Sequence, residues 1–75
     1  MSLRHKTELI IGTQDGVNVS FNTSATYVPT TVFVYQDGQM QAKDVVTETG
    51  GTGFDLAVAP ESDENWQVRY IAVIP

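Results

Sequence analysis

The side chains in this chain that are capable of chemistry are few and far apart. His5 is the only histidine and there is no cysteine. A Ser-His-Asp or Cys-His mechanism needs a nucleophile within hydrogen-bond reach of its base, and nothing in the sequence places one beside His5. Asp44 falls at the end of an expected strand, and Asp55 on a strand face turned away from the expected core. We therefore predict no catalytic residue and a protein that is not an enzyme.

Two further stretches invite a ligand. The segment ESDEN carries Glu61, Asp63, Glu64 and Asn65, but it lacks the ligand spacing and the terminal Glu of an EF-hand calcium loop, so a solvated acidic loop is expected. The stretch Gly50 to Gly53 resembles a phosphate-binding loop only in its glycines. Such loops lead into a helix whose N-terminus meets the phosphate, and a strand pattern follows here. We predict no metal and no cofactor.

The elements that would position these residues are all β. Apolar and polar residues alternate with the period of two that marks a half-buried strand, and no helical period is found. The pattern predicts strands over residues 7–11, 17–22, 31–36, 54–59 and 66–74, and a β-branched segment after Asp44. The buried face is expected to consist of Ile11, Val17, Val19, Phe21, Val32, Val34, Phe54, Leu56, Val68 and Tyr70.

The strongest local signal is the Asp37-Gly38 pair between two such runs. It predicts a two-residue type I′ hairpin in which Tyr35 faces Met40 and Gln36 faces Gln39. Together these signals predict a small immunoglobulin-like antiparallel β-sandwich of about six short strands. One domain is expected over residues 7–75. Residues 1–6 are expected to form a tail, and Met1 to Leu3 is a candidate cloning remnant.

The net charge and the length of the apolar runs limit the classes of partner that the chain can have. The chain has 75 residues, a net charge of −5 and a pI near 4.4, so it lacks the basic surface that nucleic acid requires. The longest apolar run, residues 71–74, is far shorter than the roughly 20 residues that span a bilayer, and MSLRHK has no apolar signal-peptide core. We expect no nucleic acid, no membrane and synthesis in a cytoplasm.

A chain of this size without disulfides commonly gains stability by association. Ile71, Val73 and Ile74 are more apolar than a domain rim needs. We therefore predict that they form an assembly face, docking either on a neighbouring subunit or on the strand at residues 9–11.

Four segments carry a family resemblance in their order and spacing. They are GTQDGVNVSF, VPTTVFVYQDGQMQ, GGTGFDLAVAP and WQVRYI. This order resembles a short β-sandwich module of tailed-bacteriophage tail, tail-fibre and other virion proteins, over roughly residues 11–71. The matching positions are Asp15, Gly16, Asn18, Phe21, Pro29, Gly38, Ala59, Pro60, Val68 and Tyr70. The chain departs from the module in its Gln-Asp-Gly hairpin, where Asn-Gly is more usual, and in Val45, where an aromatic residue is usual.

The resemblance implies a non-enzymatic structural protein of a phage or prophage virion, associated with the tail or tail fibre. Such a protein is made in the bacterial host cytoplasm, resides in the virion and acts by assembly with other virion subunits or with its own copies. Two alternatives stay open. A host-surface glycan-binding module would use Tyr27, Tyr35 and Trp66 as stacking platforms if these rings are exposed, and a capsid decoration domain would share the fold and differ in its partner.

Overall fold

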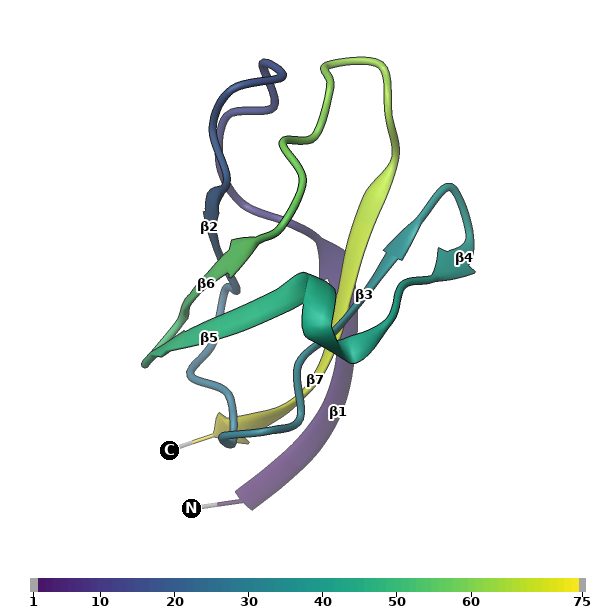
Figure 1. The fold of residues 1–75 in the computed structure, drawn as a ribbon. Helices are drawn as coiled ribbons and strands as arrows, with labels where there is room; N and C mark the ends of the chain where they lie inside the picture. Colours follow the sequence, from purple (N-terminus) through teal and green to yellow (C-terminus); the bar gives the residue numbers. More distant parts are fainter. Residues whose placement is uncertain (1, 75) are drawn as a thin grey trace.

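The computed structural model describes residues 2–74 as two packed antiparallel sheets (Figure 1). The first sheet has the strand order β1-β7-β3-β4 and the second the order β2-β6-β5. The strands are β1 (Ser2–Leu9), β2 (Ser20–Asn22), β3 (Phe33–Gln36), β4 (Gln39–Met40), β5 (Val46–Gly50), β6 (Gly53–Leu56) and β7 (Trp66–Ile74), and one 3-10 turn, η1 (Lys43–Val45), precedes β5. The predicted all-β sandwich is confirmed.

The strand order is that of an immunoglobulin fold with one exchange. β2-β6-β5 reproduces the B-E-D order of that fold, and β4-β3-β7 reproduces C′-C-F. The position of strand G, beside F, is taken here by β1, which pairs antiparallel with the whole of β7 from Ser2 opposite Ile74 to Leu9 opposite Gln67. The strand that comes last in an immunoglobulin domain therefore comes first in this one.

The segment predicted to be a tail is part of β1. Residues 2–6 are paired with β7, so the expected boundary at residue 7 is not a structural one; Met1 and Pro75 lie outside the described residues. Nearly all side chains of β1 are exposed. An edge strand of this kind is held by its backbone ladder and leaves no apolar alternation in the sequence, which explains why its first part, residues 2–6, was expected to be a tail.

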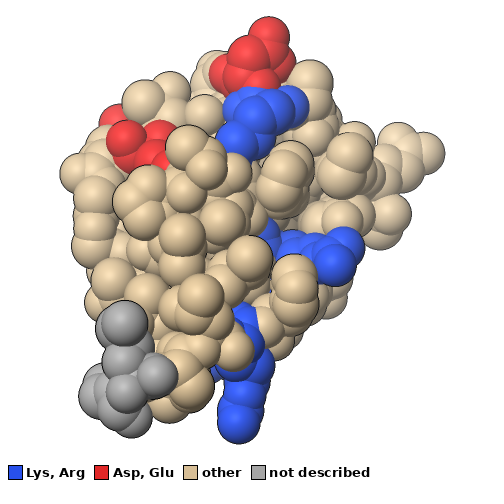
Figure 2. Space-filling model, turned by 90° about the horizontal axis from the view of Figure 1, so that it is seen from below, with Lys and Arg blue, Asp and Glu red and all other residues tan. Residues whose placement is uncertain are grey.

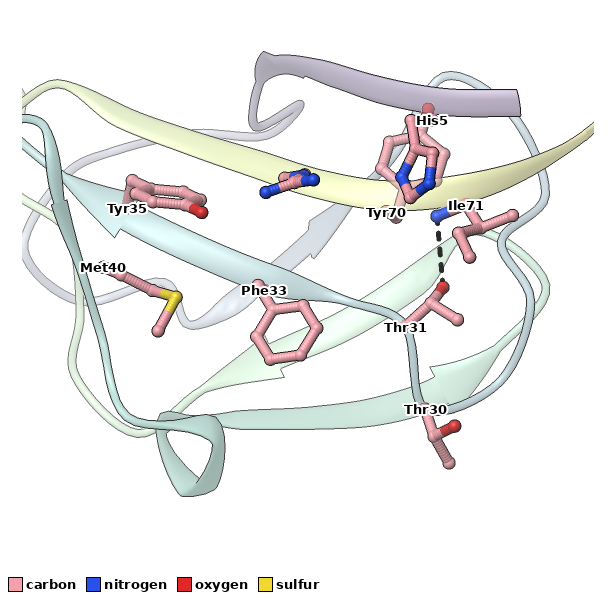
Figure 3. Close-up of a pocket in the computed structure, with 9 residues that line it drawn as sticks. His5, Thr30, Thr31, Phe33, Tyr35, Met40, Tyr70 and Ile71 are labelled. Atoms are coloured by element: carbon pink, nitrogen blue, oxygen red, sulfur yellow. Dashed lines mark hydrogen bonds between the residues drawn. The ribbon is translucent and has the colours of Figure 1, made fainter. Parts of the chain in front are cut away.

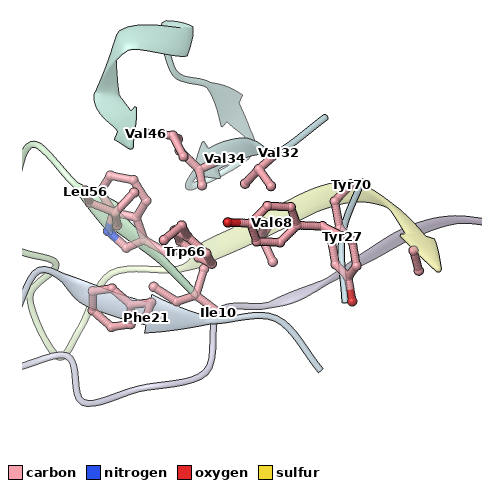
Figure 4. Packing of buried hydrophobic residues seen from close by; sticks show 12 residues of the cluster. Ile10, Phe21, Tyr27, Val32, Val34, Val46, Leu56, Trp66, Val68 and Tyr70 are labelled. Atoms are coloured by element: carbon pink, nitrogen blue, oxygen red, sulfur yellow. The ribbon is translucent and has the colours of Figure 1, made fainter. Parts of the chain in front are cut away.

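The core fills the space between the two sheets (Figure 4). β7 contributes Trp66, Val68, Tyr70 and Ala72, of which Val68 and Tyr70 were predicted. Seven of the ten predicted core residues are buried, and Ile10, Tyr27, Val46, Trp66 and Ala72 complete the cluster.

Three predicted core residues are wrong. Ile11 is 48% exposed, Val17 81% and Val19 36%. The carboxylate of Asp15 accepts the backbone N–H groups of Val17 and Asn18 at 2.9 and 2.8 Å, so this segment is a turn, and the strand begins only at Ser20. Ile10 is buried in place of Ile11 because its N–H donates to Trp66 and continues the first sheet, whereas Ile11 pairs with Asn22.

The Asp37-Gly38 hairpin is confirmed. Both residues have positive φ, 50° and 86°, as a type I′ turn requires, and Tyr35 faces Met40 across the hairpin. The glycine stretch is likewise a turn, between β5 and β6, with Gly50 opposite Gly53. The hydroxyl of Tyr27 accepts the N–H of Gly50 and donates to the carbonyl of Gly53, which ties this turn to the core.

We expect Gly38→Val to lower the free energy of unfolding by about 1–2 kcal/mol, because a β-branched residue resists φ of 86°. A Cβ at Gly38 would meet no atom within 4 Å, so the effect is one of backbone strain alone. Gly38→Asn is the matched control, since Asn tolerates the left-handed region and should cost less. Thermal melting of the three proteins checks this, and a valine variant that melts like the wild type contradicts the turn type.

Candidate functional site

The outer face of the four-stranded sheet gathers apolar side chains from all four of its strands. Cross-strand partners share a face, so the register sets Leu3 and His5 of β1, Arg69, Ile71 and Val73 of β7, Phe33 and Tyr35 of β3, and Met40 of β4 on the side away from the core. Leu3 and Met40 are about three-fifths exposed, at 61% and 60%. Apolar side chains gathered on an exposed face are common at interaction sites.

Part of this face is hollowed into a groove of about 430 Å³ (Figure 3). We call it the Arg69 groove; its lining is His5, Thr30, Thr31, Phe33, Tyr35, Met40, Arg69, Tyr70 and Ile71. The volume lies in the range of small-ligand sites, and apolar walls with a few polar groups are usual in such sites. The chemistry available is therefore apolar and aromatic contact around one guanidinium and one imidazole.

Arg69 is the free cation of this groove. The two ion pairs among residues 2–74 join Lys6 to Glu8 and Lys43 to Glu48, so the exposed Arg69 has no carboxylate partner in the described chain. A guanidinium presents a planar fork of donors that suits carboxylates and phosphates. The groove thus offers a local positive site on a protein whose net charge is −5.

Lys43 and Glu48 hold the segment that carries Phe33, one wall of the groove. The Lys43 ammonium lies 4.7 Å from the centre of the Phe33 ring, donates to the carbonyl of Val32 and pairs with Glu48 at 3.3 Å. The Glu48 carboxylate also accepts the N–H of Thr30 at 2.6 Å and that of Val32 at 3.1 Å. Thr30 has a φ of 72°, which an L-residue rarely adopts, so Glu48 fixes a strained entry into β3.

The pKa values of Glu48 and Glu8 are both lowered. Burial alone would raise the pKa of each carboxyl, but hydrogen bonds and a lysine outweigh it: Thr30, Val32 and Lys43 act on Glu48, and Ser24, Tyr70 and Lys6 act on Glu8. Glu8 accepts both the N–H and the hydroxyl of Ser24, at 2.7 and 2.6 Å, and so fastens β1 to the loop after β2. Both carboxylates are structural.

Stability should fall in acid. A carboxyl whose pKa is lower in the folded than in the unfolded chain stabilises the fold fully above its ordinary pKa of 4.5, and this stabilisation is lost as the pH falls through the folded-state pKa. We expect the urea midpoint to be flat near neutral pH and to drop below about pH 4.5. The double variant Glu8→Gln/Glu48→Gln should be less stable at neutral pH and lose less in acid; an equal loss in both proteins contradicts the assignment.

The loops at one end of the sandwich are acidic, in contrast to the Arg69 groove. Residues 10–19, 37–38 and 57–65 contain five carboxylates and no Lys or Arg: Asp15, Asp37, Glu61, Asp63 and Glu64. The loops of residues 10–19 and 57–65 lie at the top of Figure 1, with the β3–β4 hairpin lower at the right. Figure 2, seen from below, shows Lys and Arg side chains at several places together with some Asp and Glu side chains. We call residues 10–19 and 57–65 the acidic end.

Glu64 shows how part of this end is used internally. Its carboxylate accepts the N–H of Glu61, the indole N–H of Trp66 and the side chain amide of Gln36. The hydrogen bond from Glu61, then that from Trp66, lowers the pKa of this carboxyl. Glu64 therefore closes the loop onto β7 and β3. Within residues 2–74, no three His, Asp or Glu side chains gather as metal ligands would, and no helix is long and apolar enough to cross a membrane.

Some of the predicted site residues lie on the outer face and others are buried. Tyr27 and Trp66 are 3% and 1% exposed, so burial removes both as stacking platforms, whereas Tyr35 lines the groove. Ile71 and Val73 lie on the outer face, but Ile74 is on the opposite side, packed against the core cluster. The end of β7 docks on β1 of the same chain, at residues 2–5 and not at residues 9–11.

Arg69, Phe33 and Met40 line the groove but were not predicted as site residues. The signal was present, because the residues of β3 and β7 that alternate with the core positions form the outer face of the same sheet. Comparisons with family models, curated proteins and solved structures found no match.

Proposed function

We propose that this chain is a non-enzymatic structural protein of a phage or prophage virion, associated with the tail or tail fibre, that works by assembly with other virion subunits. The observation that carries the proposal is the outer face of the four-stranded sheet, which leaves Leu3, Phe33, Tyr35, Met40 and Ile71 for a partner to cover. The segments that resemble virion modules add the context, and synthesis in the bacterial cytoplasm followed by residence in the virion goes with it.

The polar groups of the molecule support a structural role. Glu8, Glu48 and Glu64, the carboxylates with the most partners, each hold loops or strands in place. His5 lies in the groove, but the only other ionisable side chains along the groove are Arg69 and the phenols of Tyr35 and Tyr70. This set suits binding better than nucleophilic catalysis.

A glycan-binding module is the second candidate, because Tyr35 and Arg69 line the same groove. An aromatic ring stacks on the apolar face of a sugar, and a guanidinium pairs with an acidic one. A capsid decoration domain is the third, and it shares the fold and differs from the first in its partner. A glycan array probed with the labelled chain tests the second candidate, and Tyr35→Ala should abolish any genuine signal.

The decisive experiment looks for the chain in particles. Virions released by a bacterium that encodes the chain are purified on a density gradient, separated into heads and tails, and analysed by quantitative mass spectrometry. We expect the chain in the tail fraction at a fixed copy number per particle. Recovery with heads would support the decoration domain, and absence from purified particles would overturn a virion role.

A further inference from the structure

We propose that copies of this chain associate head to tail, with the acidic end of one copy seated in the Arg69 groove of the next. The inference rests on the proposed assembly function and names its partner, a second copy, and the two surfaces that meet. It is carried by the complementarity of two surfaces that lie on different parts of the fold.

The groove offers what an acidic partner needs. Arg69 is exposed and has no carboxylate partner among residues 2–74, and His5 lies on the same outer face. Around these two groups the walls are Phe33, Tyr35 and Met40. Apolar walls exclude water from a contact and thereby strengthen an ion pair made inside it.

The acidic end offers the complementary set. Glu61 and Asp63 are exposed, and neither carboxylate takes part in a hydrogen bond or ion pair of the described chain. The same two loops carry two exposed apolar side chains, Val17 at 81% and Val58 at 50%. This end thus presents carboxylates and apolar tips together, as the groove presents a cation and apolar walls.

The acidic end is rigid enough to act as a single surface. The N–H of Gly16 donates to the carbonyl of Pro60 at 2.9 Å. The side chain amide of Gln14 donates to the carbonyls of Glu61 and Glu64 at 2.9 and 3.0 Å. Gly16 packs so closely on the Glu61 side chain that a Cβ there would come within 2.7 Å of it. The two loops are therefore joined before any partner arrives, which reduces the entropy lost on docking.

Charge also argues against the symmetric alternative. Two grooves that met face to face would bring the Arg69 guanidinium of each copy toward its equivalent, and two acidic ends would bring carboxylates together. A head-to-tail contact satisfies both surfaces and leaves one of each at the ends of the assembly. Such contacts produce closed rings or open filaments, and both are shapes that a tail can use.

The test is a charge exchange followed by measurement of mass in solution by light scattering over a concentration series at low salt. We expect the wild type to rise above the 8.2 kDa of one chain and to dissociate as salt is added. Arg69→Glu and Asp63→Arg, each alone, should weaken the association about tenfold or more, because each places like charges in contact. Both positions are exposed, so folding should be retained.

The exchange is then completed. An equimolar mixture of Arg69→Glu and Asp63→Arg chains, and a single chain with both changes, should regain the larger mass. Arg4→Glu and Asp44→Arg are the controls, since they make the same changes in charge outside the groove and the acidic end, and they should associate like the wild type.

The proposal is overturned if the wild type stays at the mass of one chain, if the controls dissociate as much as the two variants, or if mixing restores nothing. None of these results touches the virion role, because that is judged separately by the presence of the chain in purified particles. If the chain is found in particles but mixing the two charge variants does not restore association, the outer face has a partner other than a second copy.

Discussion

Trp66→Ala is expected to leave the chain largely unfolded at room temperature. The Trp66 side chain is 1% exposed and sits at the start of β7, the strand that pairs with both β1 and β3. Truncating a buried tryptophan to alanine costs about 3–5 kcal/mol. A single core in a domain of fewer than about 80 residues supplies about as much in total. The loss therefore takes the whole stability of the fold.

The measurement is urea unfolding followed by circular dichroism. Trp66→Phe is the matched variant: it keeps an aromatic ring in the core and loses the bond from the indole N–H to Glu64, which is 3.1 Å long in the wild type. We expect it to fold and to lose about 1–2 kcal/mol. An alanine variant that unfolds close to the wild-type midpoint would show that Trp66 is not a core residue and would restore it as a candidate stacking platform.

Glu48→Ala is expected to lower the free energy of unfolding by about 1–2 kcal/mol, since it leaves the part-buried N–H of Val32 without an acceptor and removes two exposed contacts. The backbone N–H groups of Thr30 and Val32 and the ammonium of Lys43 all lose the same carboxylate. The segment they hold enters β3 through the strained Thr30. Phe33 should move with it, because Lys43 no longer has the carboxylate that helps to keep it over the ring.

Asp44→Ala is the control for this change, because Asp44 is an exposed neighbouring carboxylate with none of these contacts. It should unfold within about 0.5 kcal/mol of the wild type. Glu48→Gln should fall between the two, since an amide oxygen retains an acceptor and loses the charge. Equal midpoints for Glu48→Ala and Asp44→Ala would mean that the carboxylate does not hold the entry to β3.

The parts of the fold that the sequence predicted are those in which local chemistry and long-range packing agree. On β7 apolar and polar side chains alternate from Trp66 to Tyr70, and the bounds of the strand and its two predicted core residues, Val68 and Tyr70, are correct. The Asp37-Gly38 turn depends on backbone preferences that few residue pairs share, and it was also correct. In both cases the residues themselves carry the information.

The predictions that were wrong concern residues whose position depends on contacts that the local sequence pattern does not record. Val17 and Val19 have the alternation of a strand. The Asp15 carboxylate accepts the N–H of Val17, however, so the backbone turns here and forms no strand until Ser20. The choice between Ile10 and Ile11 depends on which sheet each joins, and no local pattern records that. Likewise, the Arg69 groove arises from residues of four strands and of the loop before β3, so its members could be recognised only once the register of β3 against β7 was known.

The position of β1 has a consequence for synthesis on the ribosome. Among the strands of residues 2–74, β1 is made before the others, but it pairs with β7 alone, which ends at Ile74, and β3 also needs β7 to join the sheet. The four-stranded sheet therefore cannot close while any part of residues 2–74 is still inside the exit tunnel. Pairing between segments so far apart in sequence is slow to form. Until β7 emerges, β1 is an unpaired strand edge, and its lysine and arginine, Lys6 and Arg4, are the residues that keep such an edge from pairing with other nascent chains.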